Sequence, residues 1–299
     1  MIRSTNNQAA THVLDDLQRV SANLQRTQRK LSTGKEISQV EDNPVGAGRA
    51  LFLRSEVSDV QQYQKNINEA LGFQDASESS MSAVQDIMKR AKELVVQAGN
   101  GALDQSGLNN IAAEIKQLVE AAREAMNGTY AGRYLFSGTA TLTKPFPGPG
   151  LTYAGDDNVM QRVIGQGEQV DLNLRGWEAF SVPPTTGGQN VLQLLDQIAT
   201  DLQSGNRAAL GNADLQGVDD MLDQLSAARA QVGARTNRLE TQQTRLKDTE
   251  LNVEDLLSKT EDADMAKAMV DFSMQQSIYQ SALQSGARVL QPSLLDFLR

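Results

Sequence analysis

The sequence is most constrained by apolar residues that recur every three, four or seven positions along both of its outer parts. A stripe of two apolar residues per heptad is too narrow to bury a helix in a globular core, but it fits a single partner helix. Both outer parts are therefore predicted to form long helices that pack in pairs. Near the N-terminus the stripe comprises Val13, Leu17, Val20, Leu24 and Leu31. In the second half it comprises Leu215, Val218, Leu222, Leu225, Val232, Leu239, Leu246, Val253 and Leu257.

A further stripe close to the C-terminus steps by four and three residues without interruption. Thr260 is expected to cap the start of this helix, because three acidic residues follow within its first turn and oppose the helix dipole. Pro292 is expected to end the helix before an apolar tail over residues 294–298. The stripe comprises Met265, Met269, Phe272, Gln276, Tyr279, Leu283, Gly286 and Leu290.

Turn residues mark where the N-terminal helices begin and end. The first helix is expected to stop at Gly34, because glycine suits the left-handed residue that closes a helix. Asn43 and Pro44 are expected to start the second helix, as its N-cap and its first helical residue. Breaks at residues 99–101 and 127–128 then bound a third helix.

The central segment has a different composition. Residues 130–180 hold seven of the thirteen aromatic side chains of the chain. Apolar side chains alternate every second residue over 159–164 and 170–174, which predicts strands. Turn-forming residues at 155–158 and 165–167 predict hairpins. We expect four to six short strands around an aromatic core.

These elements predict a mainly α fold with a small β domain: a long antiparallel helical rod with heptad terminal helices and a central β-rich insertion at its tip. Residues 183–188 are expected to lead out of the β domain, before helix resumes at Val191 and breaks again at residues 205–206. The expected segments are residues 1–43 (N-terminal coiled-coil assembly segment), 44–130 (outgoing half of the rod), 131–187 (β-rich outer domain), 188–259 (returning half) and 260–299 (C-terminal coiled-coil assembly segment).

The two terminal helices cannot hide all of their apolar surface against each other. Gln28 and Gln276 interrupt their seams, and the apolar tail adds further exposed surface. The pattern therefore indicates ends that are weakly ordered in the single chain and complete their core with copies of the same or a related chain. An ordinary closed intramolecular bundle fits the periodicity equally well.

Composition excludes most site chemistry. The absence of cysteine and the single histidine, His12, leave no disulfide, thiolate or Cys-based zinc site and little room for a triad. The net charge, 28 − 37 = −9, argues against nucleic-acid binding, and no apolar run is long enough for membrane insertion. The acidic groups at residues 156–157 and 261–264 are interpreted as a turn and a helix N-terminus, and Asn127 of an Asn-Gly-Thr sequence as a helix cap. We expect no catalytic, cofactor-binding or metal-binding residues.

Several motifs resemble those of bacterial flagellins and their relatives. Leu-Ser-Thr-Gly-Lys at residues 31–35 and Glu-Asp-Asn-Pro at 41–44 resemble the turn region that precedes the second helix of that family. Glu-Leu-Val-Val-Gln-Ala-Gly-Asn-Gly at 93–101 resembles a motif of the next helix. Tyr-Leu-Phe-Ser-Gly at 134–138 and the ending Ser-Leu-Leu-Asp-Phe-Leu at 293–298 are similar to the hook–filament junction branch of the family, the hook-associated proteins 3.

The resemblance implies a structural protein of the bacterial flagellum that is exported unfolded through the type III apparatus and located outside the cell. It implies an adaptor between hook-associated protein 1 and the flagellin filament, assembled from copies of itself in a ring, with an export chaperone covering the C-terminal segment beforehand. It implies no enzymatic activity, no cofactor, no nucleic acid and no membrane insertion. The assembly residues carried over are Val13, Leu17, Val20, Leu24, Leu31, Met265, Met269, Phe272, Tyr279, Leu283 and Leu290.

Two other interpretations remain open at this point. The chain fits a short flagellin, which would polymerise into filaments by itself. It also fits a helical stalk that carries a ligand-binding or enzymatic β module around Trp177, which would need a concave polar pocket.

Overall fold

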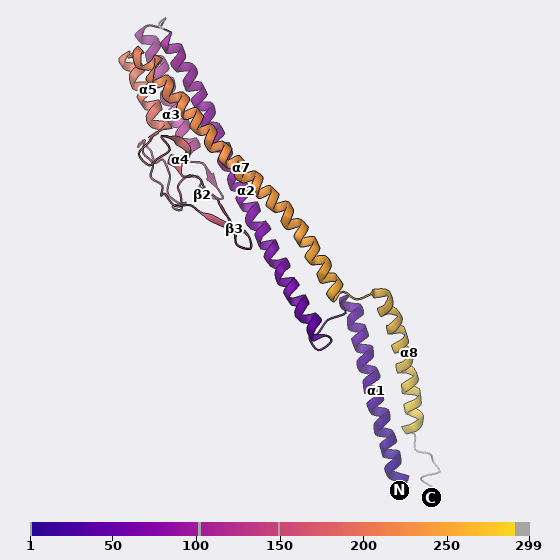
Figure 1. Ribbon diagram of the computed structural model, residues 1–299. Coiled ribbons are helices and arrows are strands. Elements are labelled where there is room, and N and C mark those ends of the chain that lie inside the picture. Colours follow the sequence, from indigo (N-terminus) through magenta and orange to yellow (C-terminus); the bar gives the residue numbers. More distant parts are fainter. Residues whose placement is uncertain (1, 101–102, 149, 291–299) are drawn as a thin grey trace. The chain divides into compact units, whose positions relative to one another are not determined.

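The computed structural model describes residues 2–100, 103–148 and 150–290, with side chains described between residues 11 and 287 of these ranges. The chain divides into two compact units. Unit 1 combines Met1–Asp59 with Thr249–Arg299, and unit 2 is Val60–Asp248. Two long helices, α2 (Pro44–Gly99) and α7 (Ala213–Glu261), each contribute residues to both units (Figure 1).

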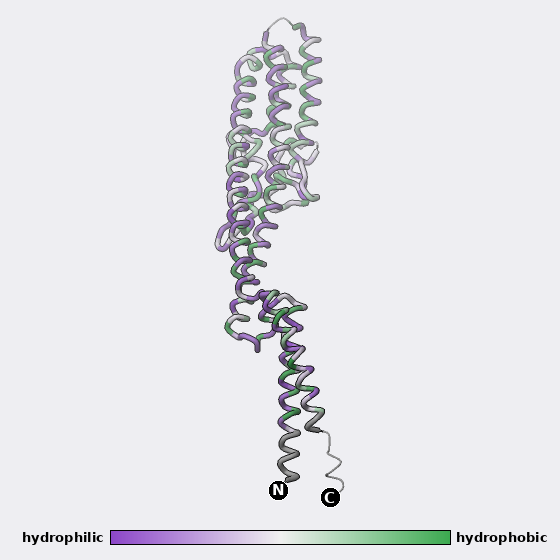
Figure 2. The backbone as a smooth tube through the Cα atoms, turned by 90° about the vertical axis from the view of Figure 1, so that its right-hand side faces the viewer, coloured by the Kyte–Doolittle hydropathy of each residue, from purple (hydrophilic) through white to green (hydrophobic). Residues whose placement is uncertain are grey.

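In unit 1, helices α1 (Ile2–Thr33) and α8 (Met265–Leu290) lie side by side (Figure 1). They are antiparallel, because an antiparallel bridge between Lys35 and Asp262 joins the end of α1 to the start of α8. In the parts of both helices that Figure 2 colours, hydrophobic and hydrophilic stretches follow one another along the chain, as the periodicity predicts.

The predicted ends of the N-terminal helices are confirmed. Gly34 has a φ of 70°, and its N–H donates to the carbonyl oxygen of Lys30 at 2.9 Å, which closes α1. The side-chain oxygen of Asn43 accepts the N–H of Gly46 at 3.0 Å, which caps the start of α2. Helix α2 ends at Gly99, at the predicted break.

The prediction that Thr260 caps the last helix is wrong. Thr260 lies inside α7, where its hydroxyl donates to the carbonyl oxygen of Leu256 at 2.7 Å. Asp264 is the cap of α8, since its carboxylate accepts the N–H groups of Ala266 and Lys267 at 3.0 and 3.1 Å. A carboxylate at this position also complements the helix dipole, which a hydroxyl cannot do.

Unit 2 has a continuous helical core. Helices α3 (Gln105–Met126) and α5 (Val191–Ser204) pack against each other, and residues of α2 and α7 join the same apolar cluster. A short helix, α6 (Arg207–Gly211), follows α5 after the predicted break, where Gly205 has a φ of 70°. The buried residues of α3 and α5 are Leu108, Ile111, Ala112, Ile115, Val119, Ala122, Met126, Val191, Leu192, Leu194, Leu195, Ile198, Ala199 and Leu202.

The β-rich region contains three antiparallel two-stranded pairs among its described residues, consistent with the expected four to six short strands. The turn predicted at residues 165–167 joins the longest pair. Phe136, Phe146 and Phe180 are fully buried, with ring centroids 4.7 Å apart for Phe136 and Phe180, so the aromatic core is confirmed. The elements are β1 (Thr129–Tyr130), β2 (Arg133–Tyr134), β3 (Gln161–Gly165), β4 (Glu168–Asp171), α4 (Gly176–Phe180), β5 (Ser181–Val182) and β6 (Gln189–Asn190).

Two predictions within this region are wrong. Residues 150–160 form no strand, and no hairpin turns at 155–158. Instead the Asp156 carboxylate accepts hydrogen bonds from the N–H groups of Thr139 and Asn158 at 2.7 and 3.0 Å. This turn-forming residue therefore holds nearby backbone segments together through its side chain. Residues 183–188 form the loop between the paired strands β5 and β6 and do not lead out of the region. The mainly α fold with a small β-rich region is confirmed.

Asn127 acts as the structural residue that the sequence indicated. It is the C-cap of α3, and its side chain both donates to the Phe146 carbonyl oxygen at 2.8 Å and accepts the Phe146 N–H at 2.9 Å. This two-point contact fixes the end of α3 to the aromatic core.

Candidate assembly interface

The stripe predicted on α1 coincides with the face of the helix that is partly covered. Its five residues are half-buried, whereas most residues between them are exposed. Because α8 is the helix that packs along α1, the covered face is the one directed at α8. These residues are Val13, Leu17, Val20, Leu24 and Leu31.

Gly286 sets how closely the two helices approach. A Cβ atom at this position would lie 3.1 Å from Cγ1 of Val13 and 3.4 Å from Cδ1 of Leu17. The absence of a side chain therefore lets α1 pack directly on the α8 backbone.

The predicted stripe on α8 divides between two faces of the helix. Phe272 and Tyr279 are half-buried on the face toward α1. Met265, Met269 and Leu283 are exposed, with Met269 59% accessible to solvent. The side chain of Leu290 lies outside the described residues. The structure thus brings only part of the predicted set together.

The face of α8 toward α1 is lined mostly by small or polar residues. Ala268 is only 6% exposed, and Gly286 is buried. Sequence periodicity found only half of this face, Phe272, Tyr279 and Gly286, because the small side chains of Ala268 and Ala282 carry little hydrophobic signal. The covered residues follow steps of four and three and comprise Ala268, Phe272, Gln275, Tyr279, Ala282 and Gly286.

Outside that face, helix α8 keeps six large apolar side chains at least 39% exposed, called here together the exposed α8 surface. At 3.6 residues per turn they lie on two sides of the helix, with Met265, Met269 and Leu283 on one side and the other three on another. Single exposed apolar residues are ordinary, but a set of this size along one helix is typical of a surface that another molecule covers. Three of its members are methionines, whose flexible side chains adapt to partners of different shape. It comprises Met265, Met269, Val270, Met274, Ile278 and Leu283.

A buried carboxylate holds the two ends of the chain together in unit 1. Glu261, the last residue of α7, is 4% exposed and forms ion pairs with Lys35 and Arg54. Its carbonyl oxygen also accepts the N–H of Glu36 at 2.7 Å, and the N–H of Ala263 donates to the Gly34 carbonyl oxygen at 2.9 Å. The interpretation of Glu261 as part of a helix N-terminus is wrong, because its partners lie more than two hundred positions away in the sequence.

Trp177 makes structural contacts within the β-rich region. Its indole N–H donates to the Asp157 carboxylate at 2.6 Å, and the Arg175 guanidinium lies 4.5 Å from its ring centroid. Burial raises the pKa of the nearby Tyr153 to about 12, and its hydroxyl donates to the carbonyl oxygens of Phe136 and Asp156. Tyr153 is therefore a protonated structural residue at neutral pH and not a general base.

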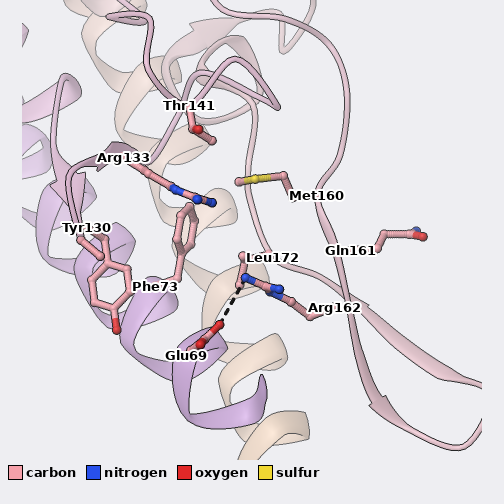
Figure 3. Close-up of a pocket in the computed structure, with 10 residues that line it drawn as sticks. Glu69, Phe73, Tyr130, Arg133, Thr141, Met160, Gln161, Arg162 and Leu172 are labelled. Carbon is pink, nitrogen blue, oxygen red and sulfur yellow. Dashed lines mark ion pairs between the residues drawn. The ribbon is translucent and has the colours of Figure 1, made fainter. Parts of the chain in front are cut away.

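A pocket of about 640 Å³ lies elsewhere, between α2 and the β-rich region of unit 2 (Figure 3). Phe73 and Leu172 form an apolar part of its wall, and Glu69 pairs with Arg162 at 3.2 Å at one side. No group of three or more His, Cys, Asp or Glu side chains within the described ranges could hold a metal ion. No described helix is long and apolar enough to cross a membrane.

The helical regions on either side of the β-rich region match a known family. Residues 4–141 match the N-terminal helical region of bacterial flagellin, and residues 215–298 match its C-terminal helical region. The chain belongs to the flagellin family. This family member is a structural component of the extracellular part of the bacterial flagellum.

Individual flagellin relatives extend the similarity over most of the chain. The flagellin of Bacillus subtilis (strain 168) is 26% identical over 310 residues, which span 100% of both chains. The flagellar hook-associated protein 3 of Salmonella typhimurium is 24% identical over 272 residues, 85% of this chain and 86% of that protein. A solved structure, a provisionally named flagellar hook-associated protein of Vibrio parahaemolyticus, is 25% identical, with a TM-score of 0.68 over 74% of this chain and 100% of its own.

Proposed function

We propose that this chain is the adaptor that joins hook-associated protein 1, on the hook side, to the flagellin filament. The observation that carries the proposal is the similarity to hook-associated relatives: one solved structure is matched over its whole length, and hook-associated protein 3 of Salmonella over 86% of its own. The role is mechanical and not enzymatic, because an adaptor between two assemblies needs surfaces for packing and no reactive group.

The exposed α8 surface supports assembly through the terminal helices. Helix α1 covers only the small-residue face of α8, so Met269 and its neighbours stay in contact with water in the single chain. Each exposed apolar side chain that a neighbour covers contributes roughly 25 cal/mol per Å² of apolar area. Copies of the chain in a ring, and flagellin or hook-associated protein 1 above and below, are the partners that would cover this surface.

The proposal assigns a role to each part of the chain. Residues 1–43 and 260–299 are the assembly segments, 44–130 and 188–259 are the two halves of the rod, and 131–187 are the outer domain. An export chaperone would cover the C-terminal segment before assembly. The assembly residues are Val13, Leu17, Val20, Leu24, Leu31, Met265, Met269, Phe272, Tyr279, Leu283 and Leu290.

The decisive test replaces a residue of the exposed α8 surface. Met269→Asp places a charge where a neighbouring subunit would pack, without touching the face toward α1, so α1 and α8 should still pair while filaments are no longer retained on the hook. Filaments are counted by electron microscopy in a motile bacterium that lacks its own junction protein. Gln284→Asp is the matched control, because it adds the same charge at an exposed polar position of α8 that has no member of the exposed α8 surface three or four residues away, and it should preserve filaments.

Phe272→Asp separates the two faces of α8. Its side chain packs toward α1, so it should disrupt the α1–α8 pair itself, measured as faster amide exchange in both helices. Normal filament retention with Met269→Asp and loss with Phe272→Asp would mean that the terminal pair works as a closed bundle, which contradicts the proposed assembly surface.

A short flagellin is the second candidate, because the Bacillus subtilis flagellin matches the whole chain at 26% identity. A flagellin polymerises by itself, whereas an adaptor needs other proteins to extend beyond a ring. Purified chain is therefore incubated with salt and filament seeds. Long filaments containing only this chain would favour the flagellin assignment over the adaptor.

A further inference from the structure

The pocket between α2 and the β-rich region is built from residues outside the assembly helices α1 and α8, although part of its lining lies within the family match at residues 4–141. We call it the Arg133 pocket; its principal lining residues are Glu69, Phe73, Tyr130, Arg133, Met160 and Leu172 (Figure 3). Its volume of about 640 Å³ lies in the range of pockets that bind ligands. All of these residues belong to unit 2, so the pocket exists independently of α1 and α8.

One wall of the Arg133 pocket depends on a glycine in α2. A Cβ atom at Gly72 would lie 2.3 Å from the hydroxyl oxygen of Tyr130, so only glycine lets Tyr130 rest on the helix. The Tyr130 ring then meets the Phe73 ring edge to face, with centroids 6.2 Å apart. Together with Leu172, which is buried, these rings give the pocket an apolar floor.

The two arginines that line the pocket differ in their ion pairs. Arg162 is paired with Glu69 at 3.2 Å (Figure 3). Arg133 makes no ion pair with any residue that the structure describes, and it points toward Met160 across the pocket (Figure 3). A guanidinium in that position can accept a carboxylate through two parallel hydrogen bonds.

The lip of the pocket holds a residue in an uncommon conformation. Ala131 has a φ of 49°, and Gly132 after it has a φ of 76°, in the turn that carries the chain from Tyr130 to Arg133. A left-handed alanine costs about 1 kcal/mol relative to glycine. Such positions are concentrated at functional sites, where the backbone aims a particular side chain.

We propose that the Arg133 pocket binds an extended segment of another protein in which an aromatic or branched aliphatic side chain stands beside an acidic one. The apolar floor receives the first side chain, and Arg133 pairs with the carboxylate of the second. Leu142 favours a protein segment over a small molecule, because it is 83% exposed directly after the lining residue Thr141. A ligand that filled only the cavity would leave this neighbouring apolar side chain uncovered.

The test uses the full chain with ¹³C-labelled methionine methyl groups, of which Met160 reports on the pocket. The probe is the peptide acetyl-Gly-Phe-Asp-Gly-amide, and its analogues replace Phe by Ala or Asp by Asn. The Met160 resonance, assigned with Met160→Leu, should shift saturably with the probe. Each analogue should bind about tenfold more weakly, because it lacks either the apolar contact or the charge-assisted hydrogen bonds.

Three variants separate the pocket from general electrostatic attraction. Arg133→Gln should weaken probe binding about tenfold. Lys144→Gln removes the same charge from an exposed position that does not line the pocket and should leave binding unchanged. Gly72→Ala changes the wall of the pocket without removing a charge, because the added Cβ atom displaces Tyr130. Alanine favours a helix over glycine, so the variant should fold but bind the probe more weakly.

Four outcomes would overturn the proposal. These are no saturable Met160 shift at about 10 mM probe, equal binding of the Asn analogue, an equal loss for Lys144→Gln and Arg133→Gln, and binding of free phenylacetate as tight as that of the peptide. The last outcome would identify a small-molecule site. None of them bears on α1 and α8, so the proposed assembly role is tested separately.

Discussion

Helix α5 in unit 2 and helix α8 in unit 1 have similar periodic patterns but different surroundings. Ile198 of α5 is fully buried, whereas Ile278 of α8 is 41% exposed. Helix α5 packs against α3 and lies within an apolar cluster that also includes residues of α2 and α7, whereas α8 packs along α1. The difference teaches that unit 2 buries the apolar face of its helix within one chain, and that the terminal pair leaves large apolar side chains exposed.

The largest expected effect is a cavity in unit 2. Ile198→Ala removes buried methyl and methylene groups from a site that neighbouring helices hold in place, so it should lower the free energy of unfolding by about 2–5 kcal/mol. Urea denaturation followed by circular dichroism measures the loss. A change below about 1 kcal/mol would mean that the core of unit 2 is loosely packed and that the contrast with α8 is smaller than the burial indicates.

A buried acid at the start of α7 should make unit 2 less stable as pH rises. Asp214 is fully buried, and neither carboxylate oxygen has a hydrogen-bond partner among the described residues. Burial, with a smaller contribution from the negative charge of Asp201, raises the pKa of Asp214 to about 6 from the ordinary value of 3.8. Between these two values the folded chain keeps a proton that the unfolded chain releases. The free energy of unfolding should therefore fall by about 2 kcal/mol as pH rises from 4 to 6, and this contribution should level off above about pH 7.

Asp214→Asn isolates this effect from the other carboxylates. The difference in the free energy of unfolding between wild type and Asp214→Asn should fall as pH rises from 4 to 6. Urea denaturation at each pH measures this difference. Asp223→Asn, on an exposed position of the same helix, serves as the control and should keep the wild-type slope. An unchanged slope in Asp214→Asn would show that this carboxyl is ionised at low pH, as an exposed acid is.

Unit 1 should respond to the loss of its buried carboxylate by a smaller amount. Glu261→Gln keeps the shape of the side chain but removes the charge that pairs with Lys35 and Arg54. Both cations are partly exposed and can regain water, so the local cost should be about 1–2 kcal/mol. The amides of Glu36 and Ala263 should then exchange about 5–30-fold faster with deuterium, because their hydrogen bonds join these segments.

Glu254→Gln is the matched control for this joint, since Glu254 is exposed on the same helix. It should leave the exchange of both amides unchanged. Equal acceleration in the two variants would point to a general effect of charge on α7 and against a specific role of Glu261.

Helix ends were predictable where their chemistry is local. Gly34, Asn43 and Gly205 mark boundaries correctly because a positive φ or a side-chain cap depends on the next few residues alone. Thr260 failed because Asp264 offers a better cap and because Glu261 is held in α7 by residues at the other end of the chain. A single sequence carries no direct record of such distant contacts.

The candidate interface was predictable on α1 and only in part on α8. Periodicity identifies α8 as a helix and includes Phe272, Tyr279 and Gly286 of its covered face. It leaves out Ala268 and Ala282, because hydrophobicity does not measure how closely a small side chain lets two helices approach. The Arg133 pocket was not predictable, because its residues come from α2 and from four separate parts of the β-rich region.

The smallest expected effect on stability sharpens the comparison most directly. Ile278→Ala is the same substitution as Ile198→Ala, made on the exposed α8 surface. Because Ile278 is 41% exposed and alanine is the better helix former, the free energy of unfolding should change by less than about 0.5 kcal/mol. The same variant should nevertheless reduce filament retention on the hook, because a covered methyl-rich side chain is lost from the proposed contact with a neighbour. A loss of stability close to that of Ile198→Ala would mean that the single chain already buries Ile278 in solution, and α8 would then belong to a closed core like that of α5.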